Sequence, residues 1–261
     1  VRASLPGRSL GQIVEHQPVG HRLFKTPQRV AGGVEHEDVV DKVSTMLGEW
    51  PDRESAPWYP VEDNLNGPAL NIEYRPTEQG HLAMGLHGFS SSDEDRFALR
   101  LLSVTLGEGM SSRLFEEVRE KRGLAYAIGS GVSAYADAGG LGIYGGVDPP
   151  RAPEAVKVIV DELVKLWDGI TEEELAKAKR LSKGRTMLRM EESRTVAMTM
   201  GAQQLIRRRV ETVEDTIAAV DAVTMDDIKR AAHRVVRSNK LALSLVGPFK
   251  DEKVFLESLK F

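Results

Sequence analysis

The sequence predicts an α+β fold in which one mostly antiparallel sheet is covered by helices. Short apolar runs bounded by turn residues predict the strands, and stretches with apolar residues every three to four positions predict the helices. Two of the strands are joined through Asp137-Ala-Gly-Gly140 as a hairpin. The 261-residue chain has 41% hydrophobic and 28% charged residues, a balance typical of a folded globular protein.

Five apolar runs account for the predicted sheet. Each has the length of an ordinary strand and is followed by glycine, proline or a short polar turn. A further short strand, Arg29–Val34, precedes them and ends in glycines. The five predicted strands are residues 70–74, 81–86, 124–135, 141–147 and 241–246.

Helical periodicity and capping residues place the helices. Serine or threonine followed by acidic residues marks starts at Ser92, Thr171, Thr212 and Thr224. The long stretch that begins at Thr171 contains Gly184 and Gly201, so we expect a kink or break at one of these glycines. The other predicted helices are residues 36–47, 112–121 and 153–167, and the helix from Ser92 ends at about residue 106.

A proline-rich segment divides the chain. Residues 51–68 contain four prolines among acidic residues and asparagines, which is the composition of a linker. The region before it, residues 1–50, is poorly patterned up to about residue 29, where glycines and prolines predict a loop. The region after it, residues 69–261, is predicted to form one domain.

Charge and composition exclude several classes of protein. Thirty-five Lys and Arg against 39 Asp and Glu give a net charge of −4, which argues against a nucleic-acid partner. The chain has no cysteine, so disulfides, thiolate metal sites and cysteine nucleophiles are excluded. No apolar run approaches the roughly 20 residues that span a bilayer, and we expect a cytoplasmic protein with no membrane partner.

The six histidines lack the spacing of a helical zinc site. Such a site needs two histidines about one turn apart on one face, with a carboxylate close by. No two histidines here have three residues between them, and His81 and His87 share a face only if their strand continues past Gly85. We therefore predict that this chain provides no metal ligands.

The segment Gly109–Tyr126, with the sequence GMSSRLFEEVREKRGLAY, differs from this background. It contains a charged amphipathic helix, a glycine that ends the helix, and the entry to a strand. On the residues alone, Arg119 suits a surface ion pair with Glu116 or another nearby carboxylate, and Tyr126 suits a half-buried strand aromatic.

This segment closely resembles the signature of the pitrilysin/insulinase family of zinc metallopeptidases, peptidase family M16, in the half that follows the zinc-binding half. Other segments match that family in the same order and spacing, so the resemblance covers roughly residues 64 to 261. They are residues 79–86, 139–144, 171–179 and 222–228.

The resemblance implies a C-terminal M16 peptidase-like (LuxS/MPP-like) domain, preceded over residues 1–50 by a remnant of a homologous N-terminal domain. In the family the first domain carries His-x-x-Glu-His, which binds zinc, and the second supplies an Arg and a Tyr that contact the substrate backbone. These two positions correspond to Arg119 and Tyr126. Because this sequence has no His-x-x-Glu-His, we expect no catalytic residues in this chain and expect zinc on a partner domain or subunit.

The resemblance leaves several hypotheses open. The chain is expected to be a fragment, the product of an incomplete gene, or a naturally degenerate subunit. Its function is expected to be the substrate-binding half of a peptide-hydrolysing zinc metalloendopeptidase, inactive alone. The alternatives are a non-catalytic assembly subunit and, less favoured, a free-standing peptide-binding module. Apolar surface left where the other domain would pack also predicts a homo-oligomer.

Overall fold

The computed structural model describes residues 4–5, 8–9, 13–15, 29–49 and 59–261. The chain forms two compact units, Val1–Pro60 with Lys183–Ala219 and Val61–Ser182 with Val220–Phe261. Most of the predicted loop before residue 29 and residues 51–58 of the predicted linker lie outside the described residues. Within the described part, no helix is both long and apolar enough to cross a membrane.

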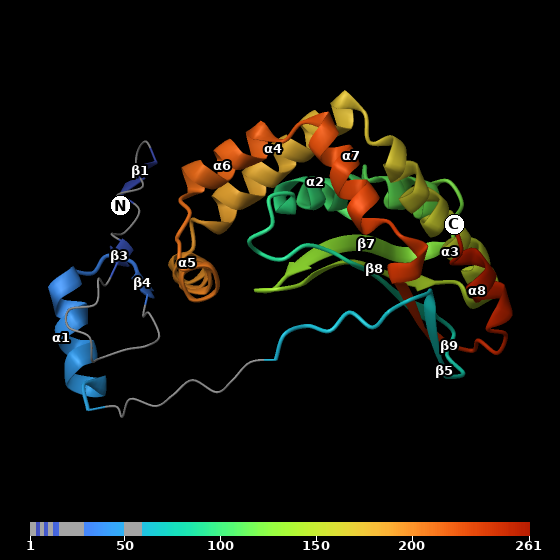
Figure 1. The fold of residues 1–261 in the computed structure, drawn as a ribbon, viewed down its shortest axis with the longest axis horizontal. Helices are drawn as coiled ribbons and strands as arrows, with labels where there is room; N and C mark the ends of the chain where they lie inside the picture. The colour runs from blue at the N-terminus through green and yellow to red at the C-terminus, as the bar shows by residue number, and fades with distance from the viewer. Residues whose placement is uncertain (1–3, 6–7, 10–12, 16–28, 50–58) are drawn as a thin grey trace. The chain divides into compact units, whose positions relative to one another are not determined.

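The larger unit contains a five-stranded sheet in the order β5-β9-β6-β8-β7 (Figure 1). All neighbouring strands are antiparallel except β5 and β9, which run parallel. This confirms the predicted α+β class with a mostly antiparallel sheet. The strands are β5 (Ala69–Tyr74), β6 (Gly80–His87), β7 (Ala125–Ala134), β8 (Gly139–Val147) and β9 (Leu241–Gly247).

One face of this sheet forms the core. Along β6, Leu82, Met84 and Leu86 are each at most 3% exposed, while the residues between them face the other side. The helices α2 (Arg96–Gly107), α3 (Ala152–Lys165) and α7 (Met225–Val235) contribute buried apolar residues to the same core. Figure 1 shows α2 and α7 over one side of the sheet. The opposite face is therefore left open within this unit.

Two elements of the larger unit differ from the prediction. The expected helix over residues 112–121 is mainly a π-helix, η1 (Phe115–Glu120). The expected start at Ser92 is a turn, and α2 begins four residues later at Arg96. The Ser92 hydroxyl lies 3.2 Å from the Ser90 hydroxyl and does not cap the helix.

Short elements complete the unit. They are the 3₁₀ helices η2 (Pro149–Arg151), η3 (Leu166–Asp168) and η4 (Ser238–Lys240), and α8 (Lys253–Ser258). Sequence periodicity did not reveal η2, η4 or α8, whereas the predicted helix over residues 153–167 reached into η3. Helix α8 spans only six residues, too few for a helical pattern to be recognised, and its Phe255 packs edge-on against Phe249 at 5.6 Å between ring centroids.

The stretch predicted as one helix from Thr171 to about residue 209 forms two helices. They are α4 (Glu172–Arg189) and α5 (Ser193–Arg207), and neither Gly184 nor Gly201 interrupts them. The break lies at residues 190–192, where Glu192 is extended and accepts a hydrogen bond from the Thr195 hydroxyl. The predicted location of the break, at Gly184 or Gly201, was therefore wrong. A helical glycine costs only about 1 kcal/mol relative to alanine, which is not enough by itself to end a helix.

The smaller unit contains short strands and helices. It has two short antiparallel pairs, β1 (Ser4–Leu5) with β2 (Arg8–Ser9) and β3 (Ile13–Glu15) with β4 (Arg29–Ala31). Strand β4 begins where the short strand Arg29–Val34 was predicted, whereas β1, β2 and β3 occur where the sequence predicted loop. Two- and three-residue strands are too short to show an alternating pattern. Helix α1 (His36–Leu47) has the predicted limits, and α6 (Val213–Ala222) begins one residue after Thr212.

Candidate functional site

The π-helix η1 determines how Arg119 is presented. Leu114 and Val118 are fully buried and anchor the helix, while Arg119 lies on its outer side. The Lys121 N–H donates to the Glu116 carbonyl at 2.9 Å, which is the five-residue spacing of a π-helix. Gly123 then adopts a φ of 59°, a conformation that favours glycine, and the chain turns into β7. π-Helical segments recur at functional sites.

The Arg119 side chain is held on one face and open on the other. Its guanidinium carbon lies 4.8 Å from the centroid of the Phe115 ring, in cation–π geometry. Its nearest carboxylate is Glu120, 4.0 Å away, and the side chain is 45% exposed. Within the described part of the chain, its N–H groups have no hydrogen-bond acceptor and the ion pair with Glu116 is not formed. The guanidinium can therefore donate to a ligand.

Two neighbouring basic residues, Lys121 and Arg122, both form ion pairs with Glu117. Glu117 accepts from Lys121 at 2.5 Å, and Arg122 donates to both the carboxylate and the carbonyl oxygen of Glu117. The hydrogen bonds from Arg122 and Lys121 lower the pKa of Glu117 to about 2. Two of the three positive charges at this end of η1 are thus paired, which distinguishes Arg119 from its neighbours.

Tyr126 lies in a β-bulge at the start of β7. Ala125 pairs with Val147 and Ala127 with Gly146, so Tyr126 is the extra residue between two successive pairs. Its side chain is 63% exposed, which makes it more open than a half-buried strand aromatic. In the described sheet β7 has a neighbour on one side only, so Tyr126 lies on an edge strand. Bulges often re-aim side chains beside active sites.

A partly buried ion pair fixes the start of the η1 segment to helix α4. Arg113 donates to both carboxylate oxygens of Glu174, at 2.6 and 2.7 Å. Burial raises the pKa of Glu174, but hydrogen bonds led by that from Arg113 outweigh it, and the pKa is lowered overall. Glu174 also completes the capping box that the sequence predicted at Thr171. The local sequence pattern predicted this cap, but it did not predict that Glu174 also pairs with Arg113, 61 residues away.

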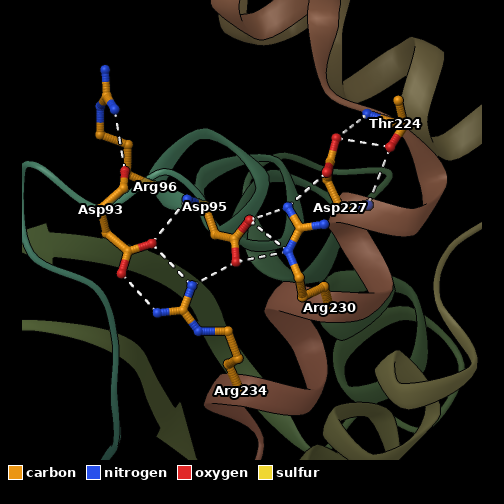
Figure 2. Close-up of polar contacts among 7 residues, drawn as sticks. All are labelled: Asp93, Asp95, Arg96, Thr224, Asp227, Arg230 and Arg234. Atoms are coloured by element: carbon orange, nitrogen blue, oxygen red, sulfur yellow. Dashed lines mark hydrogen bonds and ion pairs between the residues drawn. The ribbon is translucent and has the colours of Figure 1, made fainter.

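A second ionic network joins the turn before α2 to helix α7 (Figure 2). Asp95 is 1% exposed and accepts hydrogen bonds from Arg230 and Arg234, while Asp93 accepts from Arg234 at 2.7 Å. Burial raises the pKa of Asp95, but the hydrogen bonds from the two arginines lower it by a larger amount, so the pKa is lowered overall. At the other end of α2, a Cβ on Gly107 would lie 2.5 Å from the Ser130 nitrogen of β7. The network therefore holds a helix that packs closely against β7.

The described residues do not fit a zinc site. Among them, no group of three or more His, Asp or Glu could hold a metal ion. Strand β6 does continue past Gly85, and His81 and His87 are both exposed on its open side. Their six-residue separation along a strand is about 20 Å, too far for one metal. His87 instead lies 3.3 Å from Asp63. His16 and His21 lie outside the described residues.

The fold and this arrangement define a class: an α+β domain with a half-covered sheet, and an exposed arginine and tyrosine where a π-helix leads into the edge strand. The family model described as the peptidase M16 inactive domain matches residues 30–182, more than half of the chain. The chain belongs to the peptidase M16 family, as a domain of its C-terminal type.

Relatives and solved structures agree with this assignment. The chain is 36% identical to an uncharacterized zinc protease of Streptomyces coelicolor, over 85% of this chain and 50% of that protein. It is 34% identical to one of Mycobacterium leprae, over 90% and 54%. The crystal structure of a peptidase M16 inactive domain from Pseudomonas fluorescens has the same fold, with a TM-score of 0.73 at 24% identity over 84% and 52%. The chain thus spans about half the length of these proteins.

Proposed function

We propose that this chain is the substrate-binding half of a zinc metalloendopeptidase and acts with a domain or subunit that carries His-x-x-Glu-His. The observation that carries the proposal is the exposed pair Arg119 and Tyr126, one on a π-helix and one in a β-bulge, with the Arg119 donors unoccupied within the described chain. Relatives named zinc proteases are each about twice as long as the matched region, which supports a proposal in which a second half or a partner carries the zinc.

The two side chains are suited to bind a peptide backbone. A guanidinium donates up to five N–H bonds in a planar fork, and a phenol donates one O–H, so both can bind carbonyl oxygens. An extended peptide beside Tyr126 can also pair with the free edge of β7, which gives affinity with little dependence on sequence. In this proposal zinc on the partner supplies the activated water, and Arg119 and Tyr126 bind and orient the peptide.

Peptide binding by the full chain tests the roles of the pair. Arg119→Ala should weaken binding of a fluorescein-labelled extended decapeptide by about tenfold or more, since hydrogen bonds to charged groups are worth about 1.5–3 kcal/mol. Tyr126→Phe should weaken it by about fivefold, since a neutral hydrogen bond is worth about 1 kcal/mol. Fluorescence anisotropy measures the effect. Tyr135→Phe and Arg75→Ala are matched controls, because Tyr135 is 64% exposed and Arg75 pairs only locally with Glu73 at 2.6 Å.

Zinc content and cleavage of a quenched peptide, measured on the same purified chain, test the division of labour. We expect little zinc and no cleavage by the chain alone. Stoichiometric zinc with chelator-sensitive cleavage would overturn the proposal. If the two variants bind peptide as the wild type does, the non-catalytic assembly subunit becomes the better interpretation.

A further inference from the structure

The open face of the larger unit's sheet carries a hollow of about 640 Å³ that the proposed function does not use. This volume lies in the range of pockets that hold small ligands, about 300–1,000 Å³. It is lined by His81, Leu82, Ala83, Ala127, Ile128, Gly129, Ser130, Tyr144, Gly145, Gly146, Ser244 and Val246. All these residues belong to four adjacent strands, β9, β6, β8 and β7.

The strand register explains where the hollow lies. Ser244, Ala83, Tyr144 and Gly129 are paired in one row across the four strands. The neighbouring row, two residues along, consists of Val246, His81, Gly146 and Ala127. Both rows have only alanine or glycine at two of their four positions, so the surface is low there.

Tyr144 leaves this surface open. A Cβ on Gly142 would lie 2.9 Å from the Tyr144 hydroxyl and ring edge, so the tyrosine ring leans over Gly142, away from the row that contains Gly146. On the other side, the Gln79 amide lies over Gly146, only 2.2 Å from where a Cβ would be. The hollow therefore has Tyr144 as its aromatic wall and a floor of small residues, of which Gly146 lies under the Gln79 amide.

The hollow adjoins the proposed peptide site. Its second row ends at Ala127, the residue that follows Tyr126 along β7. The described residues that line it include no Asp, Glu, Lys or Arg. A charged side chain would lose hydration there without gaining an ionic partner, whereas an apolar one would gain by burial.

We infer that this hollow receives one bulky apolar side chain of the peptide that Arg119 and Tyr126 bind, and so selects such residues near the bound backbone. The inference rests on the proposed function, because the backbone contacts deliver the peptide to the hollow. Burial of a leucine side chain is worth about 1.5–3 kcal/mol relative to exposure, so peptides with leucine at the selected position should bind about tenfold or more tightly than those with alanine.

A peptide series on the full chain tests the inference. Labelled decapeptides that differ only by leucine or alanine, scanned position by position, are titrated by fluorescence anisotropy. One position should show the leucine preference. Ala83→Leu and Ser244→Leu, which narrow the hollow from two strands, should each bring the ratio of leucine-peptide to alanine-peptide affinity close to one. Ser133→Leu, on β7 but outside the lining, is the matched control and should preserve the leucine preference.

The outcomes separate this inference from the proposed function. A leucine preference that survives both Ala83→Leu and Ser244→Leu, in variants that melt as the wild type does, would overturn the inference. So would the lack of any preference in the wild type. Arg119→Ala should weaken all the peptides alike. If it weakens none of them, the proposed function fails. If it weakens them all while the hollow variants have no effect, only the inference fails.

Discussion

At the scale of single residues, the ion-pair partners of each charged side chain determine which of them remains available to bind a ligand. Glu117 has two cationic partners, whereas among the described residues Arg119 contacts only a carboxylate at 4.0 Å and an aromatic face. The sequence places four charged residues in a row over 119–122, and only their contacts show which remains available. Single residues also matter where a loop and a strand approach each other closely, because only glycine leaves enough room there.

Gly139 is such a position. A Cβ there would lie 2.0 Å from the Phe89 carbonyl oxygen, a backbone atom that cannot move aside easily. We expect Gly139→Ala to reduce the free energy of unfolding by about 2–3 kcal/mol, as overpacking does. Urea denaturation measures the loss. Gly131→Ala is the matched control, because a Cβ there meets nothing within 4 Å, and a similar loss in both variants would contradict the steric explanation.

At the scale of elements, capping and packing determine where helices begin and end. Helix α7 begins with a complete capping box, in which the Asp227 N–H donates to the Thr224 hydroxyl and the Asp227 carboxylate accepts from the Thr224 N–H. The sequence predicted this start correctly, because the cap is local. The same helix carries Arg230 and Arg234, so the cap also positions the network in Figure 2.

We expect Thr224→Ala to destabilise the protein by about 1 kcal/mol, the usual cost of a lost N-cap. Thermal unfolding should show a decrease of a few degrees in Tm. Thr224→Ser retains the hydroxyl and serves as the control. If the serine variant is destabilised as much as the alanine variant, the hydroxyl bond is not the cause.

Helix α4 contains a glycine whose replacement should increase the stability of the protein. Gly184 lies inside a continuous helix, and a Cβ there would meet no atom of the described chain within 4 Å. Gly184→Ala should therefore stabilise the protein by up to about 1 kcal/mol, because alanine has a lower entropic cost in a helix. The midpoint of urea denaturation measures this gain. A decrease in the midpoint would show that the glycine serves a kink or a contact.

At the scale of the whole molecule, buried and partly buried ion pairs link the stability to pH. Hydrogen bonds from arginines or from capping groups lower the pKa of Asp93, Asp95 and Asp227 below their ordinary value of 3.8. A carboxylate with a lowered pKa stabilises the folded state above its unfolded pKa, and that contribution is lost as the pH falls through the folded value.

We therefore expect Tm to change little between pH 7 and about pH 5 on account of these groups, and to fall below about pH 4. Asp95→Asn should lower Tm at pH 7 and make the acid decline shallower, since one of the shifted carboxylates is removed. Asp161→Asn is the control, because its carboxylate is half exposed in an ion pair with Lys157. An acid decline equally steep in Asp95→Asn and the wild type would contradict this assignment.

Local features were determined by the sequence alone. Periodicity, turn residues and capping boxes predicted the five strands of the large sheet and the limits of α1, because these signals lie within a few neighbouring residues. The resemblance of residues 109–126 to a known signature also identified the family, and it is the source of the proposal that Arg119 and Tyr126 bind substrate. Short elements such as α8, and the position of the break between α4 and α5, lacked a comparable local signal.

Only the tertiary structure decided which side chains come together. The bond from Arg113 to Glu174 and the contacts of Asp95 with Arg230 and Arg234 join segments 61 to 139 residues apart. The β-bulge at Tyr126 depends on the register between β7 and β8. The hollow beside Tyr144 likewise exists because four strands align small residues in two rows. Such contacts have no local sequence signal, because they form only when the sheet assembles and fixes the strand register and the buried residues.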